Sequence, residues 1–295
     1  IVERRHTLPI LANVLIEPRD GALELTATDL EMQITALADC EAKAGAATTV
    51  SARKLHDLLR ALPDDATLNI DVSGSRMTVR AGRSRFNLQT LPSGDYPRIS
   101  LGQDKLQSLS LPQKDLRALF RLVEFAMAQQ DIRYYLNGML LVIDRGSLQA
   151  VATDGHRLSW ASLAVDGEFT RQEVILPRKT VLELGKLLVD SDDPVSIDIL
   201  ANQVRCRFAN VALVSKVVEG KFPDYNRVIP VGHTKSITLD RTILLAALQR
   251  AAILANEKFR GVRLVLGPDH LKIICSNAEQ EEAEEEVEVT YDGEE

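Results

Sequence analysis

The sequence GSLQAVATDGHRL, at residues 146–158, decides the fold because the chain contains it nearly three times. Residues 21–32 read GALELTATDLEM, and residues 268–279 read PDHLKIICSNAE. Three residues occupy the matching position in these copies, and we call them the anchor residues: Asp29, Asp154 and Asn277. Asp29 and Asp154 are 125 residues apart, and Asp154 and Asn277 are 123 residues apart. Such an interval is the length of a complete domain and far exceeds a solenoid unit. The sequence therefore predicts three similar domains in succession.

Two further pairs of segments keep this spacing between the first two copies. VSARK at residues 50–54 corresponds to LPRK at 176–179, and LPSGDYP at 91–97 corresponds to VVEGKFP at 217–223. The spacing of 125 or 126 residues thus holds across a whole domain. With linkers expected after the last pair of segments, the predicted domains cover residues 1–106, 107–234 and 235–295.

The repeat also predicts that this sequence is part of a longer chain. The second copy opens with a strand and helix from Ser108. The first copy should open one repeat interval earlier, which is about 19 residues before Ile1. A full copy extends about 70 residues past its anchor, whereas 18 residues follow Asn277. We therefore expect about 50 residues of the third domain to be absent.

Two kinds of pattern alternate within each copy and predict strands and helices. Residues 22–28 and 33–39 alternate apolar and polar side chains around turns, as in an antiparallel sheet with one solvated face. Apolar residues recur at helical spacing in four segments, which are 51–62, 112–128, 177–189 and 240–256. Pro112 is expected at the first helical position of its segment. The predicted fold class is α+β, with antiparallel sheets and two helices in each domain.

Charge is unequally distributed between these elements. The formal net charge is −7, yet the four predicted helices contain eleven Lys and Arg against five Asp and Glu. The helices thus carry +6 and the rest of the chain −13. Lys and Arg favour helices, but Glu does so equally and is scarce there. Basic helices are the electrostatic footprint of a polyanion, so we expect the helices to face nucleic acid and the sheets to lie behind them.

Composition argues against several other classes of protein. Apolar runs stay below the ~18 residues that cross a membrane. Aromatic residues make up 4% of the chain, which disfavours base stacking as the main binding device. The three cysteines have no metal-like spacing and are expected to be reduced thiols in a cytoplasmic protein. Phosphate-loop, HExxH and CxxC motifs are absent from the sequence, so we expect neither a metal nor a cofactor.

The segment Asp154-Gly155-His156 is the strongest candidate for catalysis, because Asp and His two residues apart can form an acid–base pair. Such a pair needs a nucleophile, and the sequence has no Gly-x-Ser-x-Gly elbow. The Asp or Asn is shared by all copies, whereas the histidine is unique to the second. Asp and Asn commonly hydrogen-bond their own backbone in turns, so the anchor is expected to hold a turn. The sequence predicts no active site.

The stretch Gln129–Tyr135, which reads QQDIRYY, follows a basic helix. Two tyrosines beside an amide and Arg133 resemble a patch that contacts phosphate, sugar or base. The alternative is that one tyrosine is buried, and both can hold because neighbouring residues of a strand face opposite ways.

Taken together, these motifs resemble the bacterial β sliding clamp family, the β subunit of DNA polymerase III. The similarity covers essentially the whole chain and includes RHTLP (5–9), GRSRFNLQTLP (82–92), RYYLNGML (133–140), VATDGHRL (151–158), KFPDYNRV (221–228) and NEKFRGVRL (256–264). The resemblance implies three domains of one fold, each with sheets outside and two helices inside. Two molecules then close head to tail into a ring of six domains around duplex DNA.

The resemblance also implies three sets of functional residues. The DNA-contacting set is Arg5, Arg53, Gln130, Tyr134 and Tyr135. The hydrophobic pocket for partner peptides is Leu136, Thr153, Gly155, His156, Arg157, Leu158, Pro223, Arg227 and Val228. The two sides of the dimer interface are Phe86 with Leu88, and Ile253 with Leu254. The family's C-terminal segment, which completes the third domain and contributes to the pocket, is absent from this sequence.

The implied function is that of a non-catalytic processivity factor. Such a homodimer encircles double-stranded DNA without sequence preference and tethers the polymerase α subunit, the clamp loader and other proteins that carry a clamp-binding motif. Two alternatives belong to other classes. A nucleic-acid-modifying enzyme would need a metal or nucleophile constellation, which the sequence lacks, and a purely structural scaffold without DNA would not need basic residues concentrated on its helices. The remaining alternative is a non-enzymatic nucleic-acid-binding scaffold without ring closure, and the oligomeric mass of the full-length protein would separate it from a closed dimer.

Overall fold

Each copy of the repeated segment forms a seven-residue strand that ends directly before its anchor residue. These strands are β2 (Ala22–Thr28), β10 (Ser147–Thr153) and β17 (His270–Ser276). After the anchor the chain returns along an antiparallel partner, which is β3 (Met32–Asp39), β11 (Leu158–Ala164) or β18 (Glu282–Glu288). The computed structural model describes all residues except 3–7, 103, 257–259, 292 and 294–295.

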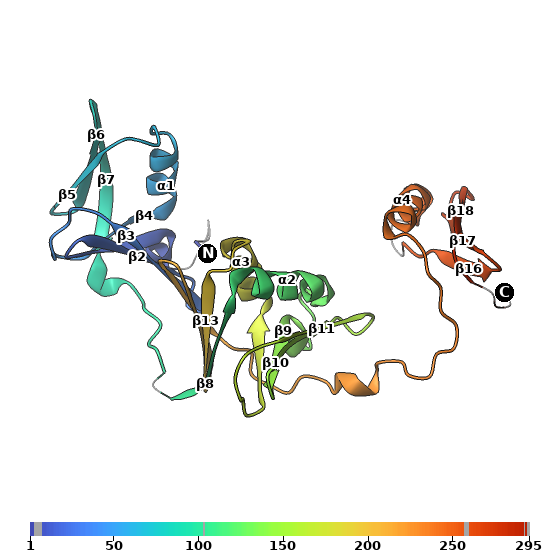
Figure 1. The fold of residues 1–295 in the computed structure, drawn as a ribbon. Helices are drawn as coiled ribbons and strands as arrows, with labels where there is room; N and C mark the ends of the chain where they lie inside the picture. Colours follow the sequence, from blue (N-terminus) through green and yellow to red (C-terminus); the bar gives the residue numbers. More distant parts are fainter. Residues whose placement is uncertain (3–7, 103, 257–259, 292, 294–295) are drawn as a thin grey trace. The chain divides into compact units, whose positions relative to one another are not determined.

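The first repeat continues the pattern with strands around one α-helix (Figure 1). Its elements are the 3₁₀ turn Pro9–Ala12, β1 (Asn13–Arg19), β2, β3, β4 (Thr48–Ser51), α1 (Ala52–Arg60), β5 (Leu68–Ser73), β6 (Arg76–Ala81), β7 (Ser84–Pro92) and the turn Ser93–Asp95. The side chain of Ser51 caps α1 by accepting a hydrogen bond from the Lys54 amide.

The second repeat has the same order and two α-helices. Its elements are β8 (Lys105–Pro112), α2 (Gln113–Val123), the 3₁₀ turns Glu124–Ala126 and Tyr134–Leu136, β9 (Gly138–Asp144), β10, β11, β12 (Gln172–Pro177), α3 (Arg178–Leu187), β13 (Pro194–Leu200), β14 (Gln203–Phe208) and β15 (Val211–Lys216). Pro112 ends β8 and is the N-cap of α2, whereas the sequence predicts it as the first helical residue. Its extended ψ of 141° keeps it in the strand.

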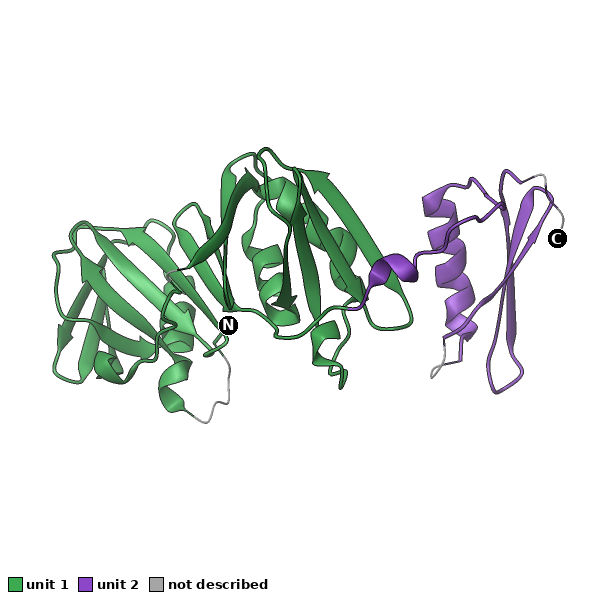
Figure 2. Ribbon diagram, turned by 90° about the horizontal axis from the view of Figure 1, so that it is seen from below, with its two compact units in different colours: residues 1–222 green, residues 223–295 purple. Residues whose placement is uncertain are grey.

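The first two repeats form one compact unit, residues 1–222, because a single eleven-stranded sheet runs through both (Figure 2). The strand order is β5-β6-β7-β4-β1-β2-β3-β15-β14-β13-β8. The antiparallel contact of β3 with β15, here called the internal junction, pairs Ile34 with Leu213 and Met32 with Ser215. A second sheet, β11-β10-β9-β12, completes the unit.

The core of the second repeat lies between its sheets and its helices. Helix α2 contributes Leu116, Leu119, Phe120 and Val123, all buried. Strand β13 contributes Val195, Ile197 and Ile199, which are at most 3% exposed. Apolar residues at helical spacing on α2 and at alternate positions on β13 therefore meet in one core, as their periodicities predict.

The second unit, residues 223–295, is a three-stranded sheet with one α-helix against it. Its elements are the 3₁₀ turn Tyr225–Arg227, α4 (Arg241–Ala251), the turn Ala252–Leu254, β16 (Arg263–Gly267), β17 and β18. Asp240 caps α4 by accepting hydrogen bonds from the amides of Thr242 and Ile243. Within the described part of the chain, no helix is long and apolar enough to cross a membrane.

Candidate nucleic-acid and peptide interfaces

The anchor residues do the same structural work in all three repeats. In each, the side-chain oxygen Oδ1 accepts hydrogen bonds from two backbone amides two to four residues further along, at 2.8–3.1 Å. These bonds close the turn between the two antiparallel strands. The shared Asp or Asn thus holds a turn, as the sequence predicts.

Arg157 is fixed in place by its neighbours on the turn after β10. Its guanidinium donates to Asp154 Oδ2 at 3.1 Å and to the Phe125 carbonyl at 2.6 Å, and it lies 5.4 Å from the centre of the Phe125 ring. The Thr153 hydroxyl donates to the Arg157 carbonyl at 2.7 Å and accepts from the Gly155 amide. Both Asp154 oxygens are therefore engaged by this turn and by Arg157, an arrangement that serves positioning and not acid–base chemistry.

Glycine is required at position 155. Its φ of +86° is a conformation that other residues rarely adopt, and a Cβ there would come within 2.9 Å of the Arg133 guanidinium. The absence of a side chain lets Arg133 approach and donate to the Asp154 carbonyl at 3.4 Å. Gly155, a predicted pocket residue, thus lets Arg133 connect the turn after β10 to the stretch Gln129–Tyr135.

The structure brings six of the predicted pocket residues together in the first unit and places the other three in the second. His156 is exposed on the turn, Leu158 is half-buried and Leu136 is buried. Thr153, Gly155 and Arg157 complete this group. In the second unit, exposed side chains flank the 3₁₀ turn Tyr225–Arg227, and they are Pro223, Arg227 and Val228.

Two apolar residues near Arg157 were not predicted from the sequence as part of this surface. Phe125 is 55% exposed and Leu122 is 60% exposed, and Ser159 donates to the Leu122 carbonyl at 2.6 Å. Large exposed apolar side chains next to a fixed guanidinium are typical of a protein-binding surface. The repeat contained a signal for this position, because Phe125 at the end of α2 corresponds to Ile253 at the end of α4.

The stretch Gln129–Tyr135 is held by an internal ion pair. Arg133 donates to both carboxylate oxygens of Asp131, at 3.0 and 2.8 Å. These hydrogen bonds hold the pKa of Asp131 at about 2, so the pair stays charged. Asn137 and Asp131 also exchange two hydrogen bonds of 2.9 Å. Arg133 is thus a rigid support, and its charge is neutralised locally.

The residues expected to contact DNA project from this support. Tyr134 is 57% exposed, Tyr135 is half-buried, and their rings meet edge to face at 5.8 Å. Gln130 is exposed and has a φ of +55°. Neither tyrosine is fully buried, and the two lie in the 3₁₀ turn Tyr134–Leu136 rather than on a strand, so the expected alternation of strand neighbours does not apply to them.

Helix α1 carries three exposed bases. Arg53, Lys54 and Arg60 are all exposed there, and Arg53 lies 3.9 Å from Asp57. Ion pairs between such exposed side chains contribute little to stability, so the Arg53 charge can still interact with a ligand from solution. Arg5, the remaining predicted contact, lies outside the described residues.

Several other helix cations bind the protein itself. Lys179 pairs with Asp29, Lys114 with Asp192, and Arg250 with Glu285, at 2.5–2.8 Å. Arg178 donates to backbone carbonyls at the end of α2. The count of bases on helices therefore overstates the charge that can face a polyanion, because sequence alone does not reveal a partner far away in the chain.

The residues of the predicted dimer interface are accessible. Phe86 and Leu88 are half-buried on β7, where residues 84–89 pair with β6 along one edge. Ile253 is 78% exposed and Leu254 is half-buried. Charge differs between the two regions: Arg83 precedes β7 and Arg85 lies within it, whereas β18 reads EAEEEVE.

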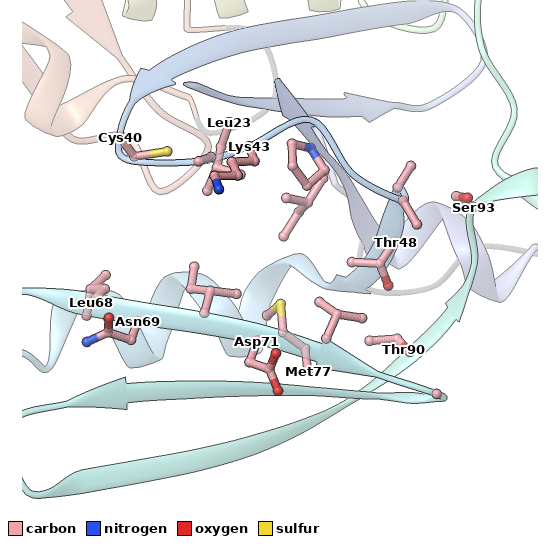
Figure 3. Close-up of a pocket in the computed structure, with 18 of the residues that line it drawn as sticks. Leu23, Cys40, Lys43, Thr48, Leu68, Asn69, Asp71, Met77, Thr90 and Ser93 are labelled. Carbon is pink, nitrogen blue, oxygen red and sulfur yellow. The ribbon is translucent and has the colours of Figure 1, made fainter. Parts of the chain in front are cut away.

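A groove of about 1200 Å³ runs through the first repeat, with Leu23 and Met77 on opposite sides (Figure 3). Its apolar lining comes from β1, β2, β5 and β6 and includes Ile70 and Val72, which are 39% and 43% exposed. The matching strand of the second repeat, β13, pairs with β8, and its Ile197 and Ile199 are buried in the core to which α2 also contributes. The described part of the first repeat has no counterpart of β8 or α2, so we interpret the groove as a packing feature. Among the described residues, no group of His, Cys, Asp or Glu side chains is arranged to hold a metal ion.

Family models match the chain along its length. They describe the DNA polymerase III beta subunit as an N-terminal domain at residues 1–100, a central domain at 110–224 and a C-terminal domain at 226–295. The beta sliding clamp of Pseudomonas putida is 48% identical over 295 residues, covering 99% of this chain and 80% of the relative. The beta sliding clamp of Escherichia coli K12 is 46% identical, covering 98% and 79%.

Solved structures agree with these matches. The crystal structure of a DnaN sliding clamp from Pseudomonas aeruginosa bound to griselimycin has a TM-score of 0.95 at 47% identity, over 99% of this chain and 80% of that one. The C. crescentus beta sliding clamp, with PEG bound to a putative beta-motif tethering region, has a TM-score of 0.92 at 39% identity, over 99% and 80%.

Proposed function

The chain belongs to the DNA polymerase III beta subunit family, the bacterial β sliding clamps, and from this premise we propose which of its surfaces close the ring, contact DNA and bind partners. Its function is that of a DNA sliding clamp. The single observation that carries the proposal is the internal junction, where one repeat joins the next by backbone pairing.

We propose that the internal junction is the pattern for the dimer interface. In the repeat, β18 corresponds to β3, and β7 corresponds to β15. Transferring the register of the internal junction pairs β18 of one subunit with the free edge of β7 in its partner, so that Phe86 faces Ala283 and Arg85 faces Glu284. Backbone pairing and the basic and acidic strands both favour this head-to-tail contact.

A second contact of the internal junction supports the same assignment. Ile1 packs against the core of the second repeat, which lies beyond the internal junction. Counted in repeat intervals of about 125 residues, Ile1 corresponds to residues 125–126 of the second repeat and to Ile253 and Leu254 of the third. We therefore assign Ile253 and Leu254 to the corresponding position on the subunit interface.

Enclosure explains why the DNA contacts can be weak. A closed ring retains duplex DNA by topology, so contacts to phosphate need only position the duplex and can be weak enough to let the ring slide. We assign this role to Arg53 with Arg5, and to Gln130, Tyr134 and Tyr135 on their rigid support. We expect binding that is independent of sequence and falls steeply with salt.

The surface around Arg157 is proposed to bind partner peptides. It offers a fixed guanidinium, an exposed histidine and apolar neighbours, which suits short segments carrying Leu and Phe. The resemblance adds Pro223, Arg227 and Val228 from the second unit. The expected ligands are the polymerase α subunit, the clamp loader and other proteins with a clamp-binding motif.

Retention on circular DNA tests this function directly. Full-length protein loaded on nicked circular duplex should remain bound at a salt concentration that removes it from linear duplex, because only a ring is released at an end. Its mass in solution should be that of a dimer. Equal loss from circular and linear DNA, or a strong preference for one sequence, would contradict the proposal and favour a scaffold without ring closure.

A further inference from the structure

We propose that Trp160 extends the surface around Arg157 and selects partner peptides that carry an additional apolar side chain beside their Leu- and Phe-containing segment. The inference rests on the proposed function, since it adds a contact to the surface already assigned to partner peptides. Trp160 is the one tryptophan of the 295 residues, and it lies on β11 two residues after the predicted pocket residue Leu158.

Trp160 and Leu158 project from the same face of the second sheet. Side chains two residues apart on a strand share a face and lie about 7 Å apart along the strand. The register of β10 with β11 places Thr153 opposite Leu158 and Val151 opposite Trp160. Residues opposite each other in an antiparallel pair also share a face. The row that begins with the predicted pocket residues Thr153 and Leu158 therefore continues to Trp160.

The indole of Trp160 presents an apolar surface to solvent and is held by a hydrogen bond. The residue is 48% exposed, and its ring N–H donates to Gln149 Oε1 at 3.3 Å. The polar atom of the ring is thereby used within the protein, and the outward surface of the ring is apolar. Its neighbours in the register of this face are uncharged, and they are Gln149, Val151, Leu158 and Ser162. An apolar ligand side chain therefore suits this surface better than a charged one.

The internal junction indicates that this position stays accessible when a neighbouring strand is in place. In the repeat, Trp160 corresponds to Thr35 of β3, and Val151 corresponds to Thr26. Strand β15 pairs with β3 along this stretch and places Ala212 opposite Thr35. Thr35 is nevertheless only half-buried. A strand paired with the edge of β11 would likewise leave Trp160 open to a ligand.

The spacing of Leu158 and Trp160 sets the pattern expected in the ligand. A peptide that lies along β11 in an extended conformation repeats its side chains on one face at the same interval of about 7 Å. When one apolar residue of the peptide contacts Leu158, the residue two positions along reaches Trp160. Tryptophan is enriched among the residues that contribute most to protein binding, because it buries a large rigid surface.

A series of peptides tests this inference on the full-length protein. The parent is a clamp-binding peptide with Leu and Phe flanked by serines, and each member of the series carries one leucine at a different flanking position. The gain is the ratio of a protein's affinity for a member to its affinity for the parent, measured by fluorescence anisotropy. We expect one position to give the wild type a gain of about tenfold.

Three variants identify the residue responsible for the gain. Trp160→Ala should reduce the gain to less than twofold, whereas Trp160→Phe keeps an aromatic ring and should retain most of it. Leu106→Ala is the matched control, because Leu106 is 49% exposed on β8, and it should retain the whole gain. The two exposed positions thus separate a specific contact from a general effect of removing surface.

The fluorescence of Trp160 reports the same contact directly. The difference between the wild type and Trp160→Phe isolates its emission, which acrylamide should quench readily in the free protein. The preferred leucine peptide should shift that emission to shorter wavelengths and protect it from acrylamide. An indole already shielded in the free protein, the absence of any leucine position with a gain, or a gain that persists in Trp160→Ala would overturn the inference while leaving peptide binding intact. Failure of the wild type to bind every peptide would overturn the proposed peptide surface and this inference with it.

Discussion

Ile253→Ala should separate the stability of the ring from the stability of the fold. Ile253 lies in the turn Ala252–Leu254 and is 78% exposed, so the isolated fold gains little from it. We expect the free energy of unfolding to change by less than about 0.5 kcal/mol, as is usual for exposed positions.

The cost should appear in dimerisation. The substitution removes three carbon atoms, worth about 2.4 kcal/mol when fully buried. Scaled by the 78% of the side chain that remains to be covered, the loss is about 2 kcal/mol at each junction. With two equivalent junctions the dimer loses about 4 kcal/mol, which corresponds to a roughly thousandfold higher dissociation constant.

Analytical ultracentrifugation of the full-length protein over a range of concentrations measures this constant. Ile243→Ala is the matched control, because Ile243 is 57% exposed and lies at the opposite end of helix α4. It should leave the dimer unchanged. If Ile253→Ala shifts the dissociation constant less than threefold, or no more than Ile243→Ala does, then this turn does not belong to the interface and the correspondence with Ile1 is misleading.

Three further changes test other parts of the molecule. Burial acts to raise the pKa of Asp198, but hydrogen bonds from Lys105, Ser108 and Arg205 lower it to about 2. The ionised Asp198 should therefore add about 2 kcal/mol to the free energy of unfolding. This contribution should be complete above pH 4 and lost as the pH falls through 2. Urea unfolding at a series of pH values should show this loss in the wild type, and Asp198→Asn should remove that part of the pH dependence. Arg157→Ala should weaken binding of a Leu- and Phe-containing clamp-binding peptide about tenfold in a fluorescence anisotropy titration, since the guanidinium no longer orders the turn; unchanged affinity for both Arg157→Ala and His156→Ala would remove the pocket assignment. Gly138→Ala would place a methyl group against the Leu176 carbonyl and should destabilise the fold by about 1–3 kcal/mol, seen as a lower midpoint in thermal unfolding.

Local patterns made the repeated elements predictable from sequence. The strand β2 occupies residues 22–28 as expected, and α3 occupies Arg178–Leu187 inside the expected segment 177–189. Strand alternation and helical spacing are properties of neighbouring residues, so they survive without knowledge of the rest of the fold. The expected helix 112–128 ends as an α-helix at Val123, because the last residues tighten into a 3₁₀ turn.

Contacts between distant residues could not be predicted in the same way. Lys179 was counted among the bases that face nucleic acid, yet its partner Asp29 lies 150 residues earlier in the chain. The identity of Lys179 carries no sign of that partner. Likewise, the pairing of β3 with β15 joins strand edges, and an alternating pattern specifies which face of a strand is buried but not which edge is occupied.

The internal junction shows how the repeats of a ring can be divided among different numbers of polypeptide chains. Main-chain amides and carbonyls make the β3–β15 contact, and every residue except proline supplies both, so the joint tolerates sequence divergence between repeats. The same joint can therefore lie within one polypeptide or between two. The point at which the covalent chain is interrupted decides only how many polypeptides share the six repeats of the ring.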